Sequence, residues 1–507
     1  MKVHFPDESP RELRRPVAAS TALGLDNGVM VQTAQLRSIE VVENEAQRVF
    51  KLQRNAYLRD PYPSLQERKN RLTALEEILV DNTDAIVEAI QRDFGHRSAE
   101  ESKILEIFPI VDGIRDTRKR LRKWMKPQKR HVSVLFATGK NRLLAQPKGV
   151  VGIVSPWNYP LFLAMGPLTG AIAAGNRAMI KMAANSQHLA RLLADKLGEV
   201  YDEDTVAILP GVRASDFSTL PFDHMCFTGS ADVGRTVMRS AADNLTPVTL
   251  ELGGKSPTII CDDFDIDEAA SRIMYAKLIN AGQTCLAPDY LFIPADKRDR
   301  FVEAAKKIVP QRYPDINDPS FTSIIDDKSY RRLRATLEDA EAKGATIVPL
   351  VPGASFNDVM RKFPPYLVLD VTDDMMIMQD EIFGPLYPIK TYSDLDEVID
   401  FITHRDRPLG FYVFSKNRAT QDKLLYSTIS GGVTINNCIM HVAQHDLPFG
   451  GSGASGMGHY HGYEGFVEFS KMRPIHVNPW FSLLHLFYPP YTGKQERLVD
   501  LTMKLKR

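Results

Sequence analysis

The sequence has little cysteine, little tryptophan and no excess charge of either sign. Its 507 residues include four cysteines and three tryptophans, and 63 lysine and arginine residues are matched by 63 aspartate and glutamate residues. So few cysteines cannot form a dense disulfide framework. Zero net charge argues against a nucleic-acid binder that works by bulk electrostatics. With 44% apolar and 25% charged residues, the composition excludes collagen and a disordered chain and favours a large globular protein of several domains.

The chain also lacks a convincing export signal and a continuous apolar span. Residues 1–38 form a loose N-terminal extension, in which acidic residues precede Arg14-Arg15 and no cleavage site follows. The longest uncharged run, Gly149–Asn176, exceeds the ~20 residues of a transmembrane helix. Prolines and asparagines interrupt it, so a buried strand, a turn and a buried helix fit better. We expect a cytoplasmic protein with reduced thiols.

Short apolar segments alternate with helix-like segments from residue 149 onward, and the alternation resumes over 258–430. This pattern predicts an α/β fold with βαβ units and a parallel sheet. The predicted strands are Val150–Val154, Ala178–Lys181, Thr205–Leu209, Met225–Phe227 and Thr249–Leu252, and the predicted helices are 161–174, 187–200 and 231–242.

Two helices are expected ahead of this region. Ser64-Leu65-Gln66-Glu67 has the pattern of a capping box before a helix with leucine and isoleucine on one face. A second helical stretch, over 115–130, is rich in lysine and arginine. It could be an anion or nucleic-acid patch, but a solvated helix face is the favoured interpretation.

Three motif matches lack the context that their function needs. Gly451–Gly456 reads G-x-G-x-x-G. It follows Pro448-Phe449-Gly450 rather than a strand, and no helix with a downstream acidic residue follows it, so we predict a glycine-rich loop. Gly254-Lys255-Ser256 resembles the end of a P-loop whose first glycine is missing. His441 and His445 are four residues apart but lack the glutamate of H-E-x-x-H, so no metal site is predicted.

Cys285 and Glu251 are the candidates for chemistry. A lone cysteine is usually an inert core residue, and the apolar surroundings of Cys226, Cys261 and Cys438 fit that reading. Cys285 differs because small and polar neighbours, Asn280–Thr284, would let a ligand approach its sulfur. Glu251 ends an apolar strand before two glycines, where burial would raise its pKa into the range of a general base. A surface glutamate before a turn is the alternative.

Two further segments follow predicted strands. Ser155–Pro160 lies at the carboxyl edge where α/β proteins bind ligands, and the Asn158 amide could donate to a developing oxyanion. Phe227–Ser230, with Gly234, ends a strand and opens a helix with small residues. Such a helix N-terminus suits a pyrophosphate.

Taken in chain order, these motifs resemble the NAD(P)-dependent aldehyde dehydrogenase superfamily. The resemblance covers roughly residues 45–475 and includes the 34-residue step from Glu251 to Cys285. Segments such as Met378–Glu381 and Ser452–Gly458 are similar to the class-3 branch, and Asn176–Met182 is similar to bacterial coniferyl aldehyde dehydrogenases. The motifs are Asn158, Lys181, Gly229-Ser230, Glu251, Cys285, Glu381–Pro385 and Pro448–Gly451.

The resemblance implies an aldehyde dehydrogenase fold with a Rossmann-like cofactor-binding domain, an α/β catalytic domain and a small β oligomerisation element. The first would comprise 39–130 and 148–252, and the second 253–440. The oligomerisation element would comprise 131–147 and 460–478, and a tail 479–507 follows. A homodimer is the expected assembly.

The resemblance also assigns roles. Cys285 would be the nucleophile, Asn158 would hold the oxyanion with the Cys285 backbone N–H, and Glu251 would activate the water that hydrolyses the thioester. Coenzyme A-acylating relatives typically lack this glutamate, so its presence favours a free acid as product. The residues expected at NAD or NADP are Trp157, Lys181, Gly229, Ser230, Gly234, Leu252, Glu381 and Phe383.

Two positions depart from the family pattern. The family usually has proline directly after the lysine and often glutamate three positions beyond it, but here these residues are Met182 and Ala184. A carboxylate there would bond the ribose 2′-hydroxyl and repel a 2′-phosphate. Its loss predicts measurable use of NADP.

The resemblance to the class-3 branch favours an uncharged apolar aldehyde as the substrate, either aromatic or medium- to long-chain aliphatic. The apolar tail from Trp480 to Tyr488 is expected to pack against the body or a partner subunit. A lid on the substrate tunnel and contact with a membrane surface are the less favoured alternatives. The residues argue against two other functional classes, a catalytically silent relative and a thioesterase. A silent relative would have lost Cys285 or Glu251, and the cofactor motifs oppose a thioesterase without redox chemistry.

Overall fold

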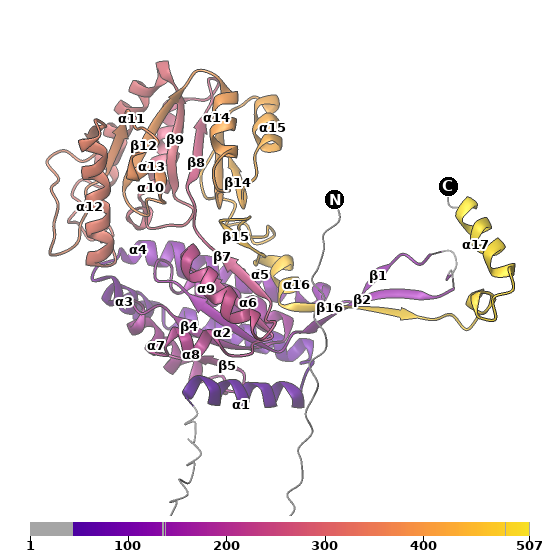
Figure 1. The fold of residues 1–507 in the computed structure, drawn as a ribbon. Coiled ribbons are helices and arrows are strands. Elements are labelled where there is room, and N and C mark those ends of the chain that lie inside the picture. The colour runs from indigo at the N-terminus through magenta and orange to yellow at the C-terminus, as the bar shows by residue number, and fades with distance from the viewer. Residues whose placement is uncertain (1–43, 134–135, 137, 482, 506–507) are drawn as a thin grey trace, which may run out of the picture. The chain divides into compact units, whose positions relative to one another are not determined.

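The computed structural model describes residues 44–133, 136, 138–481 and 483–505, so the predicted extension 1–38 lies outside the described residues. The described chain contains three β-sheets (Figure 1). Two of them are largely parallel, and their inner strands are apolar and buried because helices cover both faces. The α/β class predicted from the alternation of strands and helices is confirmed.

The first sheet has six strands in the order β15-β7-β6-β3-β4-β5. Strands β3 to β7 run parallel, and β15 pairs antiparallel with β7. Each predicted strand of this region is confirmed within two residues at either end. The strands are β3 (Val150–Ser155), β4 (Arg177–Met182), β5 (Val206–Ile208), β6 (His224–Thr228), β7 (Val248–Glu251) and β15 (Gly456–Met457).

Helices that connect these strands pack on opposite faces of the sheet. One face carries α6 (Phe162–Ala174) and α7 (Gln187–Gly198), with an outer layer made of α2 (Leu65–Asp81), α3 (Thr83–Phe94) and α5 (Phe108–Trp124). The other carries α1 (Glu45–Arg59), α8 (Ala214–Ser218) and α9 (Ala231–Ala242). The chain turns to opposite faces after β3 and after β6, so a crevice opens between their carboxyl ends.

Two predictions about the N-terminal helices need correction. The Ser64 hydroxyl does cap α2 by accepting from the Glu67 N–H at 3.2 Å, but the Glu67 carboxylate pairs with Arg71 instead of closing the capping box. A reciprocal box occurs instead at Asn44 and Gln47, before α1. The basic helix stops at Trp124 rather than 130, because Pro127 cannot continue a helix.

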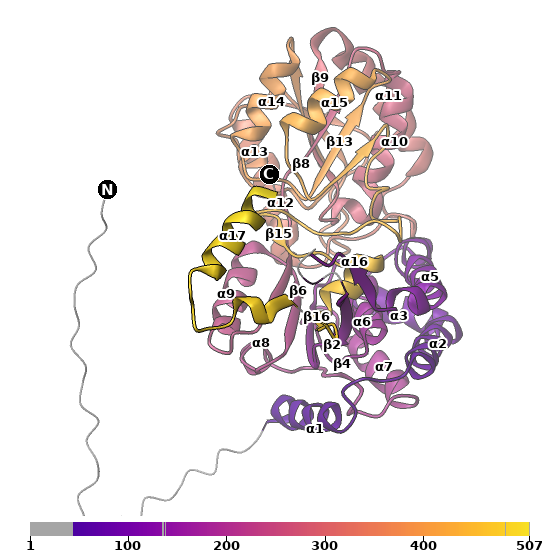
Figure 2. The ribbon, with the colours of Figure 1, turned by 90° about the vertical axis from the view of Figure 1, so that its right-hand side faces the viewer.

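The second sheet has seven strands in the order β10-β11-β12-β9-β8-β13-β14. Helices α10 and α11 lie on one face, and α14 and α15 on the other (Figures 1 and 2). The strands are β8 (Ser256–Ile260), β9 (Pro288–Pro294), β10 (Thr346–Pro349), β11 (Tyr366–Leu369), β12 (Leu386–Tyr392), β13 (Gly410–Phe414) and β14 (Gly432–Ile435). The helices are α10 (Ile266–Leu278), α11 (Arg298–Arg312), α12 (Asp327–Ala342), α13 (Met376–Gln379), α14 (Leu395–Thr403) and α15 (Arg418–Ser427).

The third sheet is antiparallel and joins β1 (Gln128–Arg130), β2 (Lys140–Pro147) and β16 (Ser470–Val477), with α16 (Gly462–Glu468) ahead of β16. The tail that follows ends in α17 (Lys494–Leu505). Trp480 is 97% exposed and Phe481 53%, so these two side chains do not pack against the body of their own chain. Among the described residues, no helix combines the length and apolar character needed to cross a membrane.

Candidate active site

Four predicted segments lie side by side at the carboxyl edge of the six-stranded sheet. Lys181 is near the end of β4, Asn158 follows β3, Ser230 follows β6 and Glu251 ends β7. These strands are neighbours in the order β7-β6-β3-β4. The Gly229 N–H donates to the Glu251 carbonyl at 3.0 Å and holds two of the segments together.

The remaining predicted residues come from the seven-stranded sheet. Cys285 precedes β9, and Glu381 and Phe383 precede its neighbour β12. A cavity of about 630 Å³ lies where the two sets of loops meet. Lys181 and Gly234 do not line it. The predicted residues that do are Trp157, Asn158, Gly229, Ser230, Glu251, Leu252, Cys285, Glu381 and Phe383.

The N-terminus of α9 fits the phosphate end of a dinucleotide. Ser230 occupies the N-cap position with extended backbone, yet its side chain makes no capping hydrogen bond. Among the described residues no side chain caps the first N–H groups of the helix, and Ser230 and Asp232 at its start line the cavity, as an anion site requires. Gly234 lies one turn later, and a Cβ there would stand 2.7 Å from Leu252, so a small residue is needed for this packing.

The opposite wall combines a carboxylate and two aromatic rings. The Trp157 and Phe383 rings meet edge to face at 5.5 Å. Phe383 has a φ of 48°, an uncommon value for a bulky residue. Glu381 lies against Gly253, where any Cβ would overlap its carboxylate. Burial, aided by the charge of Asp289, raises the pKa of Glu381 to about 8.

Lys181 is partly buried at the end of β4, and its ammonium donates to the Met182 carbonyl at 3.2 Å. Burial lowers its pKa. Ala184 lies on the exposed turn that follows. No ion pair joins Lys181 to a carboxylate in the part of the chain that the structure describes. The turn therefore places no acidic side chain of its own beside the lysine.

The loop that carries Cys285 is tightly constrained. Asn280 and Ala281 have φ values of 53° and 51°, and Gly282 packs so closely on the Gly384 carbonyl that a Cβ would overlap it. Cys285 itself is partly exposed to the cavity, unlike the other three cysteines, which are buried as predicted. Burial and the nearby carboxylates raise the pKa of the Cys285 thiol to about 12.

Glu251 is buried, with 1% of its surface exposed. Neither of its carboxylate oxygens has a hydrogen-bond partner among the described residues. Burial, followed by the charge of Glu468, holds the pKa of Glu251 well above its usual value. The buried strand-end carboxylate predicted from the sequence is confirmed, and the surface alternative is wrong.

Asn158 is 3% exposed, and its amide nitrogen donates to the Gln283 carbonyl at 3.3 Å. An amide NH₂ carries two N–H donors, so one remains beyond this bond. The adjacent Tyr159 hydroxyl lies 2.6 Å from the Thr284 hydroxyl. Asn158 and Tyr159 thus contact the two residues that precede Cys285 in the chain.

A second cavity, of about 320 Å³, reaches Cys285 from another side. Its lining is dominated by aliphatic and aromatic side chains, and its few polar groups include Asp112 and His445, which lie 2.8 Å apart. Cys285 and Leu163 line both cavities. The apolar lining residues include Ile104, Leu105, Phe108, Phe162, Ile279, Ile439, Met440, Val442 and Phe449.

The motifs that were set aside have other structural roles. Gly451–Gly456 is a loop whose last residue begins β15, so no helix opens directly from it; the next helix, α16, starts at Gly462. Lys255 donates to Asp289 at 2.6 Å, and His441 lies 2.9 Å from Thr434. No group of three or more metal-ligating side chains occurs among the described residues. Several cations of the basic helix pair with acids, such as Arg118 with Glu76 at 2.8 Å.

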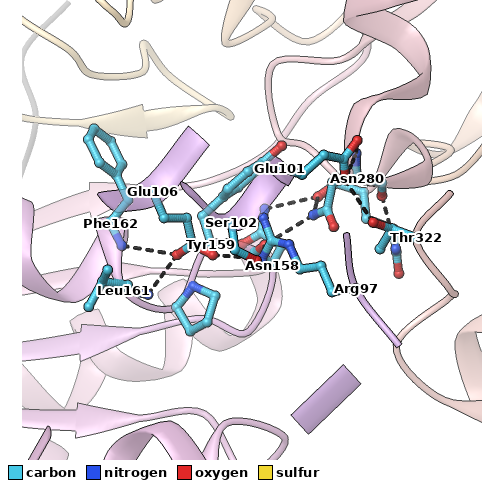
Figure 3. A network of polar contacts seen from close by, with 12 residues as sticks. Arg97, Glu101, Ser102, Glu106, Asn158, Tyr159, Leu161, Phe162, Asn280 and Thr322 are labelled. Carbon is cyan, nitrogen blue, oxygen red and sulfur yellow. Dashed lines mark hydrogen bonds and ion pairs between the residues drawn. The ribbon is translucent and has the colours of Figure 1, made fainter. Parts of the chain in front are cut away.

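Sequence reasoning did not single out three charged residues next to this site, of which Arg97 and Glu106 are fully buried and Glu101 is partly buried. Arg97, Glu101 and Glu106 surround the backbone of Asn158 and of the Cys285 loop (Figure 3). No motif marks them, because charged residues near helix starts are common and these three match no known site pattern.

Comparison with known proteins agrees with this geometry. Residues 32–475 match the aldehyde dehydrogenase family. The coniferyl aldehyde dehydrogenase of Pseudomonas sp. strain HR199 is 42% identical over 84% of this chain and 89% of its own length. The 4,4'-diaponeurosporen-aldehyde dehydrogenase of Staphylococcus aureus is 36% identical over 84% and 92%. A substrate-bound structure of Staphylococcus aureus AldH superposes with a TM-score of 0.84 at 34% identity, covering 90% of this chain and 100% of that one.

These matches extend across both parallel sheets and the loops between them. Neighbours of the same fold include an NAD-dependent enzyme from Sinorhizobium meliloti, and they support the use of NAD or NADP. The recognition made from ordered motifs is therefore confirmed. The chain belongs to the aldehyde dehydrogenase family, whose members are oxidoreductases that act on aldehydes.

Proposed function

We propose that this enzyme oxidises an apolar aldehyde, aromatic or medium- to long-chain aliphatic, to the carboxylic acid with NAD or NADP. One observation carries the proposal: Cys285 lies where a polar cavity and an apolar cavity meet. The polar cavity has the groups that suit a dinucleotide, and the apolar one disfavours an anionic substrate because its one basic lining residue, His445, is paired with Asp112.

The dinucleotide would be held by residues of both sheets. Ser230 and the start of α9 suit the pyrophosphate, Lys181 the adenosine ribose and Glu381 the nicotinamide ribose. Trp157, Phe383 and Leu252 would shape the pocket around the ring, with Gly234 allowing the close packing beneath it. When bound, the nicotinamide supplies the hydride acceptor for the oxidation.

Cys285 begins the reaction. Its thiolate forms a bond to the aldehyde carbon, and the carbonyl oxygen becomes an oxyanion that the free Asn158 N–H and the Cys285 backbone N–H stabilise. Removing one such donor typically costs about 3–4 kcal/mol of transition-state stabilisation. Oxidation of this adduct leaves a thioester on Cys285.

Glu251 completes the cycle. Its carboxylate takes a proton from a water molecule, the resulting hydroxide attacks the thioester carbon, and the carbon–sulfur bond breaks to release the acid and the Cys285 thiolate. Neither carboxylate oxygen has a hydrogen-bond partner within the part of the chain that the structure describes, which leaves both oxygens able to accept that proton.

The direct test measures formation of reduced nicotinamide by absorbance, with NAD or NADP and a panel of aldehydes. Wild-type enzyme should turn over benzaldehyde, cinnamaldehyde or decanal, and Cys285→Ala should abolish turnover. A Cys285→Ala variant with full activity, or a wild type active on short charged aldehydes only, would refute the proposal. Hydrolysis of thioesters without reduction of cofactor would favour the thioesterase interpretation instead.

We also propose which residues form the cofactor-binding domain, the catalytic domain and the oligomerisation element. The cofactor-binding domain would comprise 39–130 and 148–252, and the catalytic domain 253–440. The elements 131–147 and 460–478 would pair two subunits into a homodimer in the cytoplasm. The sheet of β1, β2 and β16, together with the exposed Trp480, supports this assembly. Sedimentation at micromolar concentration should give the mass of a dimer, and a monomer would contradict it.

A further inference from the structure

A buried ion pair lies directly beneath Asn158. Arg97 and Glu106 are both fully buried, and their charged groups lie 2.7 Å apart. Arg97 comes from the loop between α3 and α4 (Ala99–Ser102), and Glu106 from the π-helical turn η1 (Lys103–Ile107). Burying two charges costs several kcal/mol, and a well-packed apolar pair is often as stable. Stability alone is therefore a weak explanation for the pair.

Each partner of the pair bonds the segment that carries Asn158. The Arg97 guanidinium donates to the Asn158 carbonyl at 2.8 Å. The Glu106 carboxylate accepts from the Leu161 and Phe162 N–H groups at 2.8 and 3.1 Å. These N–H groups belong to the start of α6, which has no capping side chain of its own. The pair thus fixes the Asn158 backbone on its carbonyl side and at the following helix (Figure 3).

The same network continues into the loop that carries Cys285. The Asn158 carbonyl also accepts from the Asn280 side chain at 3.0 Å, and the Asn280 backbone N–H donates to Glu101 at 3.0 Å. Glu101 in turn accepts from the Thr322 hydroxyl at 2.7 Å. The Asn158 carbonyl oxygen is therefore one point at which the two halves of the site are joined, beside the Asn158–Gln283 and Tyr159–Thr284 hydrogen bonds.

Packing restricts Arg97 further. Its guanidinium carbon lies 5.0 Å from the ring centres of both Phe94 and Tyr159. The planar group is held between two aromatic rings, which fixes the direction in which it donates.

We propose that Arg97 and Glu106 are positioning residues that set the Asn158 amide against the Cys285 sulfur. The proposal rests on the proposed function, in which Asn158 stabilises the oxyanion. Neither charge touches the aldehyde. They act through the Asn158 backbone, and a shift of about 1 Å in such a donor can cost about a hundredfold in rate.

The test replaces both charges together, because a single substitution would leave an unpaired buried charge that could unfold the protein. Arg97→Met/Glu106→Gln keeps the side-chain volumes. The expected result is a fall in kcat of about 10- to 100-fold with an apolar aldehyde. The KM for the cofactor should stay within about twofold, because no cofactor-side residue is changed.

Two readouts separate positioning from a structural role. Alkylation of Cys285 by iodoacetamide forms no oxyanion, so its rate should stay within about twofold of wild type. In an Asn158→Ala background the double substitution should cause no further loss of kcat, since the group it positions is gone. The matched control is Arg177→Met/Asp204→Asn, a pair at the amino end of β4 whose atoms lie 3.0 Å apart, and it should leave kcat unchanged.

The outcomes are distinguishable. If wild type oxidises aldehydes and Asn158→Ala lowers kcat, yet the Arg97/Glu106 variant retains full kcat, the positioning role is refuted. Equal losses of aldehyde oxidation and of alkylation would also refute it and indicate a general disturbance of the site. A wild type without aldehyde oxidation would refute the proposed function itself.

Discussion

The two cavities that meet at Cys285 differ sharply in their linings. The larger carries the carboxylates of Asp232, Glu251, Asp380 and Glu381 and the cations of Lys328 and Arg332. The smaller is apolar, and its one acid, Asp112, is paired with His445. The charged side can bind a polar cofactor and move protons, whereas the apolar side can select only by shape and hydrophobic burial. Substitutions on the two sides should therefore change different kinetic constants.

The largest effect is expected for Glu251→Gln on the charged side. Turnover should fall by about 10²- to 10⁴-fold, because glutamine cannot take a proton from water. The acyl group should then accumulate on Cys285, and the mass of the intact protein should report it. Glu199→Gln on the surface is the control.

The outcome that contradicts this prediction is wild-type turnover in Glu251→Gln. Loss of activity through unfolding is not expected, because neither Glu251 oxygen has a hydrogen-bond partner among the described residues that the substitution would strand. Thermal unfolding should therefore start at a temperature close to that of wild type.

The pH dependence should reflect the same side of the site. Glu251 and Cys285 act in their deprotonated forms, and burial raises the pKa of both, that of Cys285 to about 12. A raised pKa moves deprotonation to higher pH, so kcat/KM should increase through neutrality by up to about tenfold per pH unit and peak in the alkaline range. A flat kcat/KM profile between about pH 6 and pH 8 would contradict the raised pKa of Cys285, and a flat kcat profile over the same range, with thioester hydrolysis limiting, would contradict that of Glu251.

A smaller effect is expected on the apolar side. Met440→Asn places an amide in that lining and should lower kcat/KM for decanal or cinnamaldehyde by about tenfold, while acetaldehyde changes little. Met440→Leu, which conserves volume, should behave like wild type. Equal losses for long and short aldehydes would show that the cavity does not select the substrate.

The smallest effect concerns cofactor choice. Ala184→Glu restores the carboxylate that the family often has and should lower kcat/KM for NADP by about fivefold, because an exposed like-charge contact is worth about 1 kcal/mol. Ala184→Gln has the same size without the charge and should keep NADP use. A wild type that prefers NAD by more than about 1,000-fold, close to 4 kcal/mol, would refute dual use.

Much of the fold followed from local pattern. The strands from β3 to β7 and the helices α6, α7 and α9 were predicted because apolar period and length distinguish a buried strand from a helix. The predictions were wrong where one neighbouring residue determines a side-chain contact or the end of a helix. The Glu67 carboxylate pairs with Arg71 instead of closing the capping box. Pro127 ends α5 before the end of the basic stretch. The apolar tail is expected to pack against the body or a partner subunit; exposure of Trp480 and Phe481 in the single chain excludes the body for these two side chains, and packing against a partner stays a prediction.

The candidate site was predictable only in part, because some of its residues are brought together by packing and not by local sequence. Cys285 and Glu251 lie beside small residues, and Asn158 directly follows a predicted strand, so local sequence could point to all three. Arg97 and Glu106 lie nine residues apart in unremarkable segments, and only packing brings them beneath Asn158. Because both charges are buried, each needs its partner, and together they bond the segment that carries Asn158.

By itself, the sequence determined the balance of 63 positive and 63 negative residues, the order of the motifs and the alternation that builds two parallel sheets. These depend on residue type and local spacing. The tertiary structure alone decided that Cys285 joins a charged cavity to an apolar one, that both oxygens of Glu251 lack partners within the described residues, and that one Asn158 carbonyl links both halves of the site. Each of these depends on atoms distant in sequence, whose distance and burial only packing fixes.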